Sequence, residues 1–260
     1  MTWRWTAALC ALAAAAAAEK APTADEIAAR ANLAAYYAGK DGRARVKMTI
    51  RDSRGRTRER EMTILRRDSA DGGDQKFFVY FHRPADVRNM AYLVWKHAGG
   101  DDDRWLYQPA LDLVKRIAAG DKRTSFVGSD FLYEDVSGRG VDEDHHELLR
   151  SEGGSYVLRN TPKEKGSVEF DRYDLWIDKK TFMPMRAEYF DKGGRKYRVV
   201  EALEVKEIQG NPTVTRSKAS NLESGGDTVS EFTGVQYDIG VPDEIFAERY
   251  LRAAPRQWLK

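Results

Sequence analysis

The sequence predicts a mainly β protein of the α+β class, built on an antiparallel sheet of about eleven strands. Apolar and polar residues alternate with a period of two in one segment after another, which is typical of half-buried strands. Glycine-containing turns separate many of these segments, and strands joined by such short turns are antiparallel. The chain has 260 residues, of which 42% are hydrophobic and 32% charged, a composition typical of globular proteins.

The first 18 residues have the composition of an export signal. An Ala/Leu-rich run follows Arg4 and ends in an A-x-A cleavage pattern at Ala16-Ala17-Ala18, whereas a buried N-terminal helix is the alternative. The single cysteine, Cys10, lies in this run, so we expect no disulfide and no thiol chemistry beyond it. We therefore predict a signal peptide over residues 1–18 and one soluble periplasmic domain over residues 19–260.

A helix of about 15 residues is expected at the start of this domain. Thr23-Ala-Asp-Glu26 has the pattern of a capping box, and the Ala-rich stretch after it runs to Tyr37 before Gly39. Two further short helices are expected, one over residues 129–136 and one over residues 242–251, where Pro242 suits a helix start.

The strand pattern begins directly after the first helix. In residues 43–51 the apolar positions are Ala44, Val46, Met48 and Ile50, and the turn at residues 52–55 leads into a second alternating segment over residues 57–67. Further strands are expected over residues 76–82, 91–97, 104–108, 112–118, 145–150, 156–160, 170–178, 184–191, 195–207, 213–223 and 228–238.

A sheet of this size that is apolar on one face must curl, since open twisted sheets rarely exceed about ten strands. The N-terminal helix is too small to cover the whole apolar face. Two alternatives follow: either the barrel closes and fills its own interior, or a concave apolar surface remains for a ligand.

Charge and motifs leave little support for nucleic-acid binding, membrane spanning or catalysis. The net charge of +2 lacks the basic excess that nucleic acid requires, and no apolar run after the start approaches the roughly 20 residues of a spanning helix. His145 and His146 are adjacent in a strand and point to opposite faces, so they do not form a metal site. We expect no enzyme, cofactor or metal; an enzyme would need Asp130 or Glu134 in a cleft with a raised pKa.

Apolar and aromatic residues on the expected strands and the central short helix are the candidates for a ligand-binding surface. Ordinary core packing is the alternative for each of them, although flexible methionines suit a surface that accepts ligands of variable shape. The candidates are Val46, Met48, Ile50, Met62, Ile64, Val79, Leu93, Trp95, Trp105, Tyr107, Phe126, Phe131, Leu132, Met183 and Met185.

Several motifs resemble the LolA-like outer-membrane lipoprotein-sorting protein family of the LolA/LolB superfamily. The resemblance covers roughly residues 76–200, and its most specific part is Phe126–Asp135. The motifs are His82-Arg83-Pro84, Trp105–Pro109, Leu111–Ile117, Ser125–Asp135, Leu175–Asp178 with Thr181 and Pro184, and the turn Asp191–Gly194.

The resemblance implies an incomplete antiparallel barrel around an apolar cavity, lidded by short helices, that carries a lipid or acylated cargo across the periplasm. In that family the arginine of an Arg-Pro pair at the cavity mouth holds the lid closed, which implies a lid latch at Arg83 and a moving lid at residues 129–136. An arginine that merely stabilises a turn before Pro84 is the alternative.

The implied partners are a lipid or acyl-chain ligand, transient contact with a membrane, and either lipoprotein-sorting machinery or an RND-type exporter. This chain is longer than LolA proper and has the additional segment Ser125–Asp135, so the resemblance does not fix the cargo. A structural or scaffolding β-protein of the cell envelope with a filled core is the alternative function.

Overall fold

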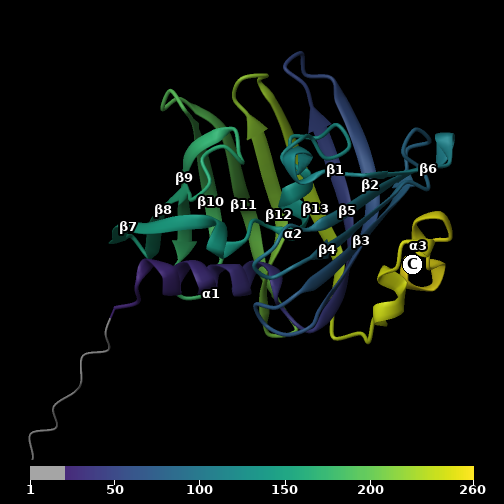
Figure 1. Ribbon diagram of the computed structural model, residues 1–260, viewed down its shortest axis with the longest axis horizontal. Coiled ribbons are helices and arrows are strands. Elements are labelled where there is room, and N and C mark those ends of the chain that lie inside the picture. Colours follow the sequence, from purple (N-terminus) through teal and green to yellow (C-terminus); the bar gives the residue numbers. More distant parts are fainter. Residues whose placement is uncertain (1–20) are drawn as a thin grey trace, which may run out of the picture.

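The computed structural model describes residues 21–260, which form one curled sheet of thirteen antiparallel strands with short helices on both of its faces (Figure 1). The predicted signal peptide and Cys10 lie outside the described residues. The strands are β1 (Asp41–Arg51), β2 (Thr57–Asp68), β3 (Gln75–Arg83), β4 (Ala91–Lys96), β5 (Asp103–Gln108), β6 (Leu113–Arg116), β7 (Asp144–Glu152), β8 (Ser155–Pro162), β9 (Phe170–Asp178), β10 (Pro184–Asp191), β11 (Lys196–Ile208), β12 (Asn211–Asn221) and β13 (Gly226–Tyr237).

The first strand, β1, lies at the centre of the sheet, and the sheet does not close into a barrel. It runs outward from β1 to the edge strand β6, crosses to the opposite edge strand β7, and meanders back to β13, which pairs with β1. The edge strands β6 and β7 do not pair with each other, so the curled sheet is a half-barrel with one open side. The expected incomplete antiparallel barrel is therefore confirmed. Its thirteen strands equal the number of segments expected individually and exceed the expected total of about eleven.

The period-two pattern of the first strands determines which face they turn inward. Val46, Met48 and Ile50 are buried on β1, while Arg45 before them and Lys47 between the first two are exposed. Because Val46 lies opposite Met62 in the pairing of β1 with β2, the apolar sets of the two strands share the concave face.

Helix α1 (Ala24–Tyr36) covers one half of the concave face. The side chain of Thr23 accepts a hydrogen bond from Glu26 N, and Glu26 binds back to Thr23 N at 2.7 Å, so the expected capping box is present. The helix buries Ile27, Ala28 and Ala31 against strand residues that include Leu158 and Ile177. It lies across β7 to β11 (Figure 1).

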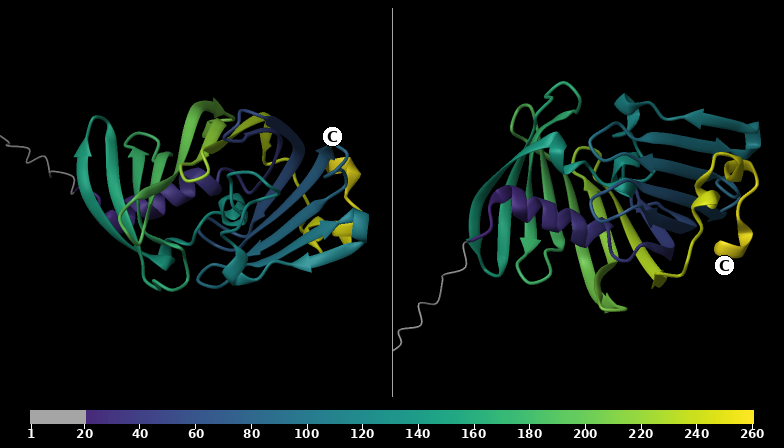
Figure 2. Two further views of the ribbon diagram at one scale, coloured as in Figure 1. Left: turned by 90° about the horizontal axis from the view of Figure 1, so that it is seen from above. Right: turned by 60° about the horizontal axis from the view of Figure 1, so that its bottom comes forward.

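The segment that crosses from β6 to β7 lies inside the curl of the sheet and contains only short helical turns (Figure 2). These are η2 (Ala119–Asp121), α2 (Tyr133–Ser137) and η3 (Val141–Glu143), and η1 (Pro109–Leu111) joins β5 to β6. The helix expected over residues 129–136 is thus shorter and begins later. Because α2 has no side-chain cap from Leu132, its position depends on contacts with the sheet.

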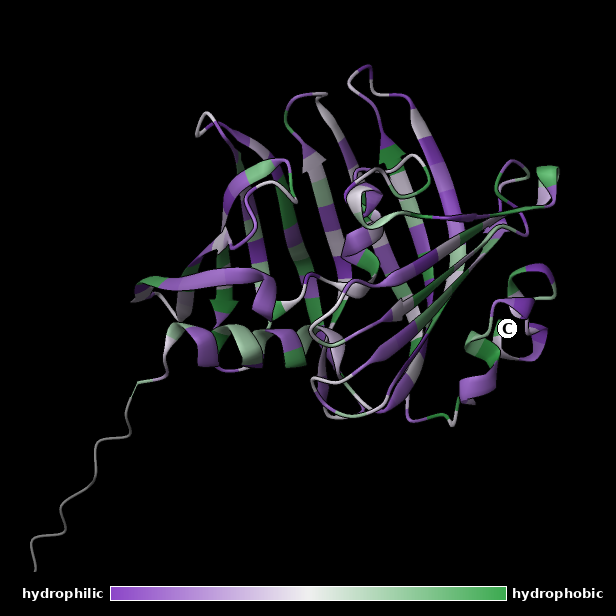
Figure 3. Cartoon of the chain, viewed as in Figure 1, coloured by the Kyte–Doolittle hydropathy of each residue, from purple (hydrophilic) through white to green (hydrophobic). Residues whose placement is uncertain are grey.

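The C-terminal segment covers the convex face of the other half of the sheet. Its helical turns η4 (Asp243–Phe246), α3 (Arg249–Arg252) and η5 (Arg256–Trp258) replace the single helix expected over residues 242–251. They pack against outward side chains of β2 to β5, so these strands are apolar on both faces; Figure 3 shows the mixed hydropathy along the strands. None of the helices in residues 21–260 is long and apolar enough to cross a bilayer.

Candidate functional site

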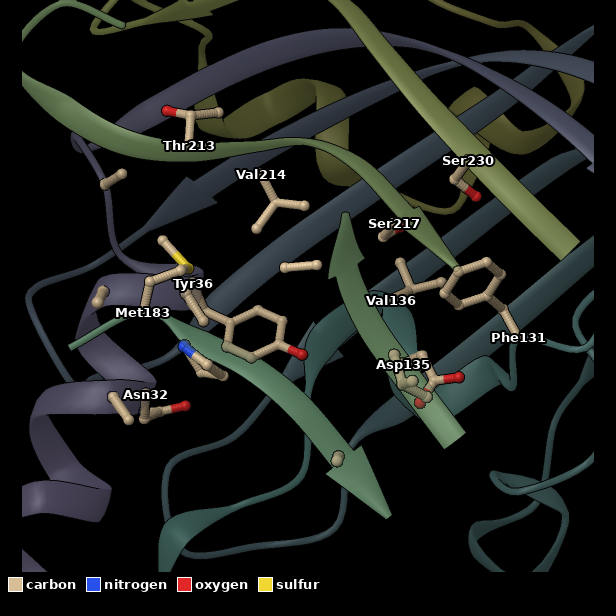
Figure 4. Close-up of a pocket in the computed structure, with 18 of the residues that line it drawn as sticks. Asn32, Tyr36, Phe131, Asp135, Val136, Met183, Thr213, Val214, Ser217 and Ser230 are labelled. Atoms are coloured by element: carbon tan, nitrogen blue, oxygen red, sulfur yellow. The ribbon is translucent and has the colours of Figure 1, made fainter. Parts of the chain in front are cut away.

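An apolar cavity of about 470 Å³ lies between the concave face of the sheet, α1 and the crossing segment (Figure 4). Helix α1 contributes Asn32 and Tyr36, and the crossing segment contributes Phe131 and Val136. In Figure 4 the ring of Tyr36 extends from α1 towards the crossing segment, which carries Val136 and Phe131. The interior of the sheet is thus not completely filled by its own side chains.

Seven of the predicted ligand-binding residues line this cavity. They come from β1, β2, the crossing segment and the turn before β10, and they are Val46, Met48, Met62, Ile64, Phe126, Phe131 and Met183. The structure therefore brings together apolar side chains that are up to 137 residues apart in the sequence, from Val46 to Met183. Whether they bind a ligand stays a prediction.

Four of the predicted residues lie on the opposite, convex face of the sheet. Leu93, Trp95, Trp105 and Tyr107 pack against the C-terminal segment, and Trp95 Nε1 donates a hydrogen bond of 2.7 Å to Phe246 O. The prediction that these four residues line the cavity is therefore wrong. Side chains alternate between the two faces of β4 and β5, and the inward ones are those of Tyr92, Val94 and Leu106. Both faces of these strands are apolar, so alternation alone does not identify the inner one.

The remaining predicted residues are buried or half-buried beside the cavity without lining it. Val79 is fully buried in the core beneath the crossing segment, and Ile50 is buried near the end of β1. Leu132 precedes α2, and Met185 lies beside a bulge in the pairing of β10 with β9. None of these residues is among those whose side chains form the cavity wall.

The cavity also uses residues that the sequence analysis did not select. Small side chains of α1, including Ala31 and Ala35, form one wall, and hydroxyl groups of Thr213, Ser217 and Ser230 form part of another. The run of alanines in the first helix was a visible signal, because small residues leave room beside a helix. The hydroxyl residues of β12 and β13 carried no such signal.

The crossing segment is attached to the sheet by polar contacts at its tip and at α2. The guanidinium of Arg198 on β11 donates a hydrogen bond to the carboxylate of Asp135 on α2. At the tip, Asp130 N donates to Thr228 Oγ1 at 3.0 Å, and Thr228 donates back to the Asp130 carboxylate at 2.7 Å. These bonds hold the crossing segment over the cavity.

A buried ionic cluster lies at the base of α2. Arg123 donates to the Glu134 carboxylate at 2.5 Å, and Lys122 and Arg139 approach the same carboxylate within 3.5 Å. Burial alone would raise the pKa of Glu134, but Arg123, Lys122 and Arg139 together lower this pKa to about 2. The cluster fixes the return of the chain from α2 to β7.

Among the described residues, Arg83 has no hydrogen bond or ion pair with the crossing segment. Its exposed guanidinium forms a two-point contact with Glu61 on the neighbouring strand β2, with a shortest N–O distance of 2.6 Å. In residues 21–260, both of its side-chain partners are thus the oxygens of Glu61, which fits the alternative of a strand-end arginine. Arg198 rather than Arg83 donates a hydrogen bond to the crossing segment, at Asp135.

The candidate catalytic carboxylates have opposite electrostatics. Burial raises the pKa of Asp130, and Asp227 adds to this effect, whereas Glu134 is held ionised by three cations. His146 lines the cavity, but both ring nitrogens are engaged, with Asn160 Oδ1 at 2.6 Å and Val141 O at 2.9 Å. No group of three or more potential metal ligands occurs in the part of the chain that the structure describes.

A family model described as an uncharacterized protein family matches residues 73–253. The chain belongs to this family. A DUF1329 family protein from Desulfovibrio piger is 30% identical, with a TM-score of 0.81, and the match covers 88% of this chain and 97% of that one.

Two further solved structures place this family member in the LolA-like fold. A putative outer membrane lipoprotein-sorting protein domain from Vibrio parahaemolyticus is 26% identical over 88% of this chain and 98% of that chain, with a TM-score of 0.80. A LolA superfamily protein from Nitrosomonas europaea is 22% identical over 88% of this chain and 100% of that chain, with a TM-score of 0.68. The predicted LolA-like resemblance is confirmed. No curated protein matches the chain.

Proposed function

We propose that this LolA-like protein is a carrier that binds a lipid or acylated cargo in the cavity beneath the crossing segment. The observation that carries the proposal is the apolar cavity of about 470 Å³ on the concave face of an unclosed sheet. An apolar cavity of about 150 Å³ binds benzene, so this volume suits roughly three times as many carbons, the size of one long acyl chain.

Energetics favour a carrier with a movable lid. Burial of about 16 methylenes contributes on the order of 12 kcal/mol before the costs of association. Release of such a ligand requires a second state with a more open cavity. The crossing segment is suited to this change, because a few polar contacts, among them Arg198 with Asp135 and Thr228 with Asp130, join its tip and α2 to the sheet.

The proposal includes the location and the partners that the sequence analysis predicts for the carrier. A carrier of this kind would act in the periplasm after removal of residues 1–18, without catalysis or a cofactor. It would accept cargo from one membrane partner, such as an RND-type exporter or lipoprotein-sorting machinery, and deliver it to another. Transfer would follow lid opening on contact with the partner.

Lipid extraction and native mass spectrometry of the purified protein test the proposal. We expect a co-purified lipid or, after delipidation, saturable binding of a fluorescent C16 acyl probe that unlabelled fatty acid displaces. Absence of bound lipid together with absence of probe binding would refute the carrier role and favour a scaffolding protein.

A further inference from the structure

A basic groove lies on the convex face of the sheet, behind the cavity. It has a volume of about 780 Å³ and is bounded by side chains of β1 to β3 and β13, by the turn after β3 and by the end of the C-terminal segment. Val46 and Met62 border both the groove and the cavity, so a single layer of sheet separates the two. The groove is distinct from the proposed lipid site.

The charge of the groove is not balanced by the protein. Six cationic side chains from β1 to β3, the following turn and the end of the C-terminal segment line it, whereas its only lining side-chain carboxylates in residues 21–260 are Glu61 and Glu231. Both carboxylates already have partners, because Glu61 binds Arg83 and Glu231 lies 3.8 Å from Arg216. The cations are Arg45, Lys47, Arg83, Arg88, Arg256 and Lys260.

Three arginines of the groove have no partner among the described residues. Arg45, Arg88 and Arg256 are exposed, and no hydrogen bond or ion pair joins their side chains to any other group in residues 21–260. By contrast, most arginines of the chain, such as Arg139 and Arg186, bind carboxylates. Burial and the charge of Arg45 also lower the pKa of His82 in the groove, consistent with a positive potential there.

The floor of the groove is aromatic and aliphatic. The rings of Tyr80 and His82 meet edge to face at a centroid distance of 5.2 Å, and Leu259 lies beside them. Strands β1 to β3 are interior strands whose edges are already paired, so an occupant cannot extend the sheet and must be recognised through its side chains. Guanidinium groups at the rim match carboxylates, and the floor matches an apolar side chain.

We propose that this groove binds an acidic peptide segment of a protein partner, one that carries carboxylates on both sides of an apolar residue. A membrane surface is a poorer fit, because a flat layer of headgroups would reach the rim of a concave site and leave its floor uncovered. Since the groove and the cavity are on opposite faces, the proposal does not depend on the lipid-carrier function.

Fluorescence anisotropy with a labelled EEEFEEE peptide and the whole protein tests the proposal. We expect saturable binding at about 25 mM NaCl that weakens at least about tenfold at about 300 mM NaCl, since salt screens exposed charges. A QQQFQQQ peptide should not bind. Absence of EEEFEEE binding at low salt would overturn the proposal.

Matched variants distinguish the effect of charges in the groove from the effect of the protein's net charge on peptide binding. Arg88→Gln/Arg256→Gln should weaken peptide binding at least about tenfold. Lys163→Gln/Lys165→Gln removes two exposed charges from the turn between β8 and β9 and should leave binding within about twofold. Arg45→Gln alone provides a second test on a rigid strand. Equal weakening by both double variants would overturn the proposal.

A binding experiment with lipid vesicles tests whether a membrane, rather than an acidic peptide, occupies the groove. Vesicles with about 30% phosphatidylglycerol should bind the wild type and Arg88→Gln/Arg256→Gln equally. If the vesicles bind and require these arginines while the peptide does not bind, the groove is a membrane site and the proposal is wrong. Binding of the C16 acyl probe should be unchanged in all groove variants.

Discussion

The guanidinium of Arg198 on the interior strand β11 donates to the carboxylate of Asp135 on α2, which lies inside the curl of the sheet. Arg198 is 5% exposed in its side chain, and its Nε and Nη1 atoms have no hydrogen-bond partner in the described part of the chain. The pair joins the crossing segment to the wall of the cavity, so opening of the proposed lid would have to break it, together with the contact of Asp130 with Thr228.

Arg198→Met should release the lid. Loss of one partner of a buried ion pair typically lowers the free energy of unfolding by about 3–5 kcal/mol. We expect about 3 kcal/mol here, because Asp135 keeps its hydrogen bond from Leu132 N. Stopped-flow fluorescence should show faster dissociation of an acyl probe, by at least about tenfold, since about 1.4 kcal/mol of lost docking gives that factor.

Arg195→Met is the matched control for Arg198→Met. Arg195 also pairs with carboxylates, those of Asp191 and Glu223, but on the exposed surface, where an ion pair contributes less than about 1 kcal/mol. Unchanged probe dissociation in Arg198→Met would show that this pair does not hold the lid.

The sequence predicts a face correctly where only one face of a strand is covered. On β1, Val46 and Met48 alternate with Arg45 and Lys47, and this contrast identifies the inner face. On β4 the C-terminal segment covers the outer side as well, so Leu93 resembles its inward neighbour Val94 in hydropathy. A segment about 150 residues later thus decides which side chains can face the cavity.

Contacts between segments that are distant in the sequence could likewise not be predicted from the local pattern of apolar and polar residues. The strands, the capped first helix and the open sheet follow from local alternation, turn chemistry and the resemblance. The lid contact joins Asp135 to Arg198, which is 63 residues later, and no local pattern distinguishes Arg198 from the other arginines on strands. The resemblance directed attention to Arg83, which instead binds Glu61.

The ionic cluster around Glu134 should make stability depend on acid pH. The folded-state pKa of Glu134 is lowered from 4.5 to about 2, so the stability it contributes is present above about pH 4.5 and is lost as the pH falls towards 2. This shift corresponds to about 3 kcal/mol. Urea unfolding of wild type and Glu134→Gln should therefore differ most near pH 6 and converge towards pH 2.

Glu164→Gln is the control for the pH experiment, because Glu164 is exposed in the turn between β8 and β9. Its unfolding free energy should follow that of the wild type at every pH. If the curves of Glu134→Gln and wild type stay parallel from pH 6 to pH 2, Glu134 is not the group that the cluster stabilises.

Trp105→Ala should destabilise the protein without affecting the ligand. Trp105 packs on the convex face against Trp95, with ring centroids 4.9 Å apart, and is 8% exposed. Its removal should cost about 3 kcal/mol in chemical unfolding. Affinity for the acyl probe, measured well below the melting temperature, should stay within about twofold, because the sheet separates Trp105 from the cavity.

Leu148→Ala is a reference for this variant, since Leu148 is an apolar residue of β7 that is 37% exposed. Its truncation should cost well under the loss at Trp105. A fall in probe affinity that appears with Trp105→Ala at temperatures where the variant is fully folded would place the ligand on the convex face instead.

Ala44→Phe should block the cavity from within. Ala44 lies on β1 opposite Ile64 of β2, and both residues line the cavity, so a phenyl ring at this position would occupy space that the ligand needs. Because the ring enters an existing void, the cost to stability should be below about 1.5 kcal/mol, while probe affinity should fall by at least about tenfold.

Thr49→Phe adds the same ring to the opposite face of the same strand, between the inward side chains of Met48 and Ile50. It should leave probe affinity unchanged, which separates loss of space from a general effect of an added aromatic residue. If Ala44→Phe is folded and binds the probe as tightly as Thr49→Phe, the ligand does not occupy this cavity, since only the ring at position 44 would enter it.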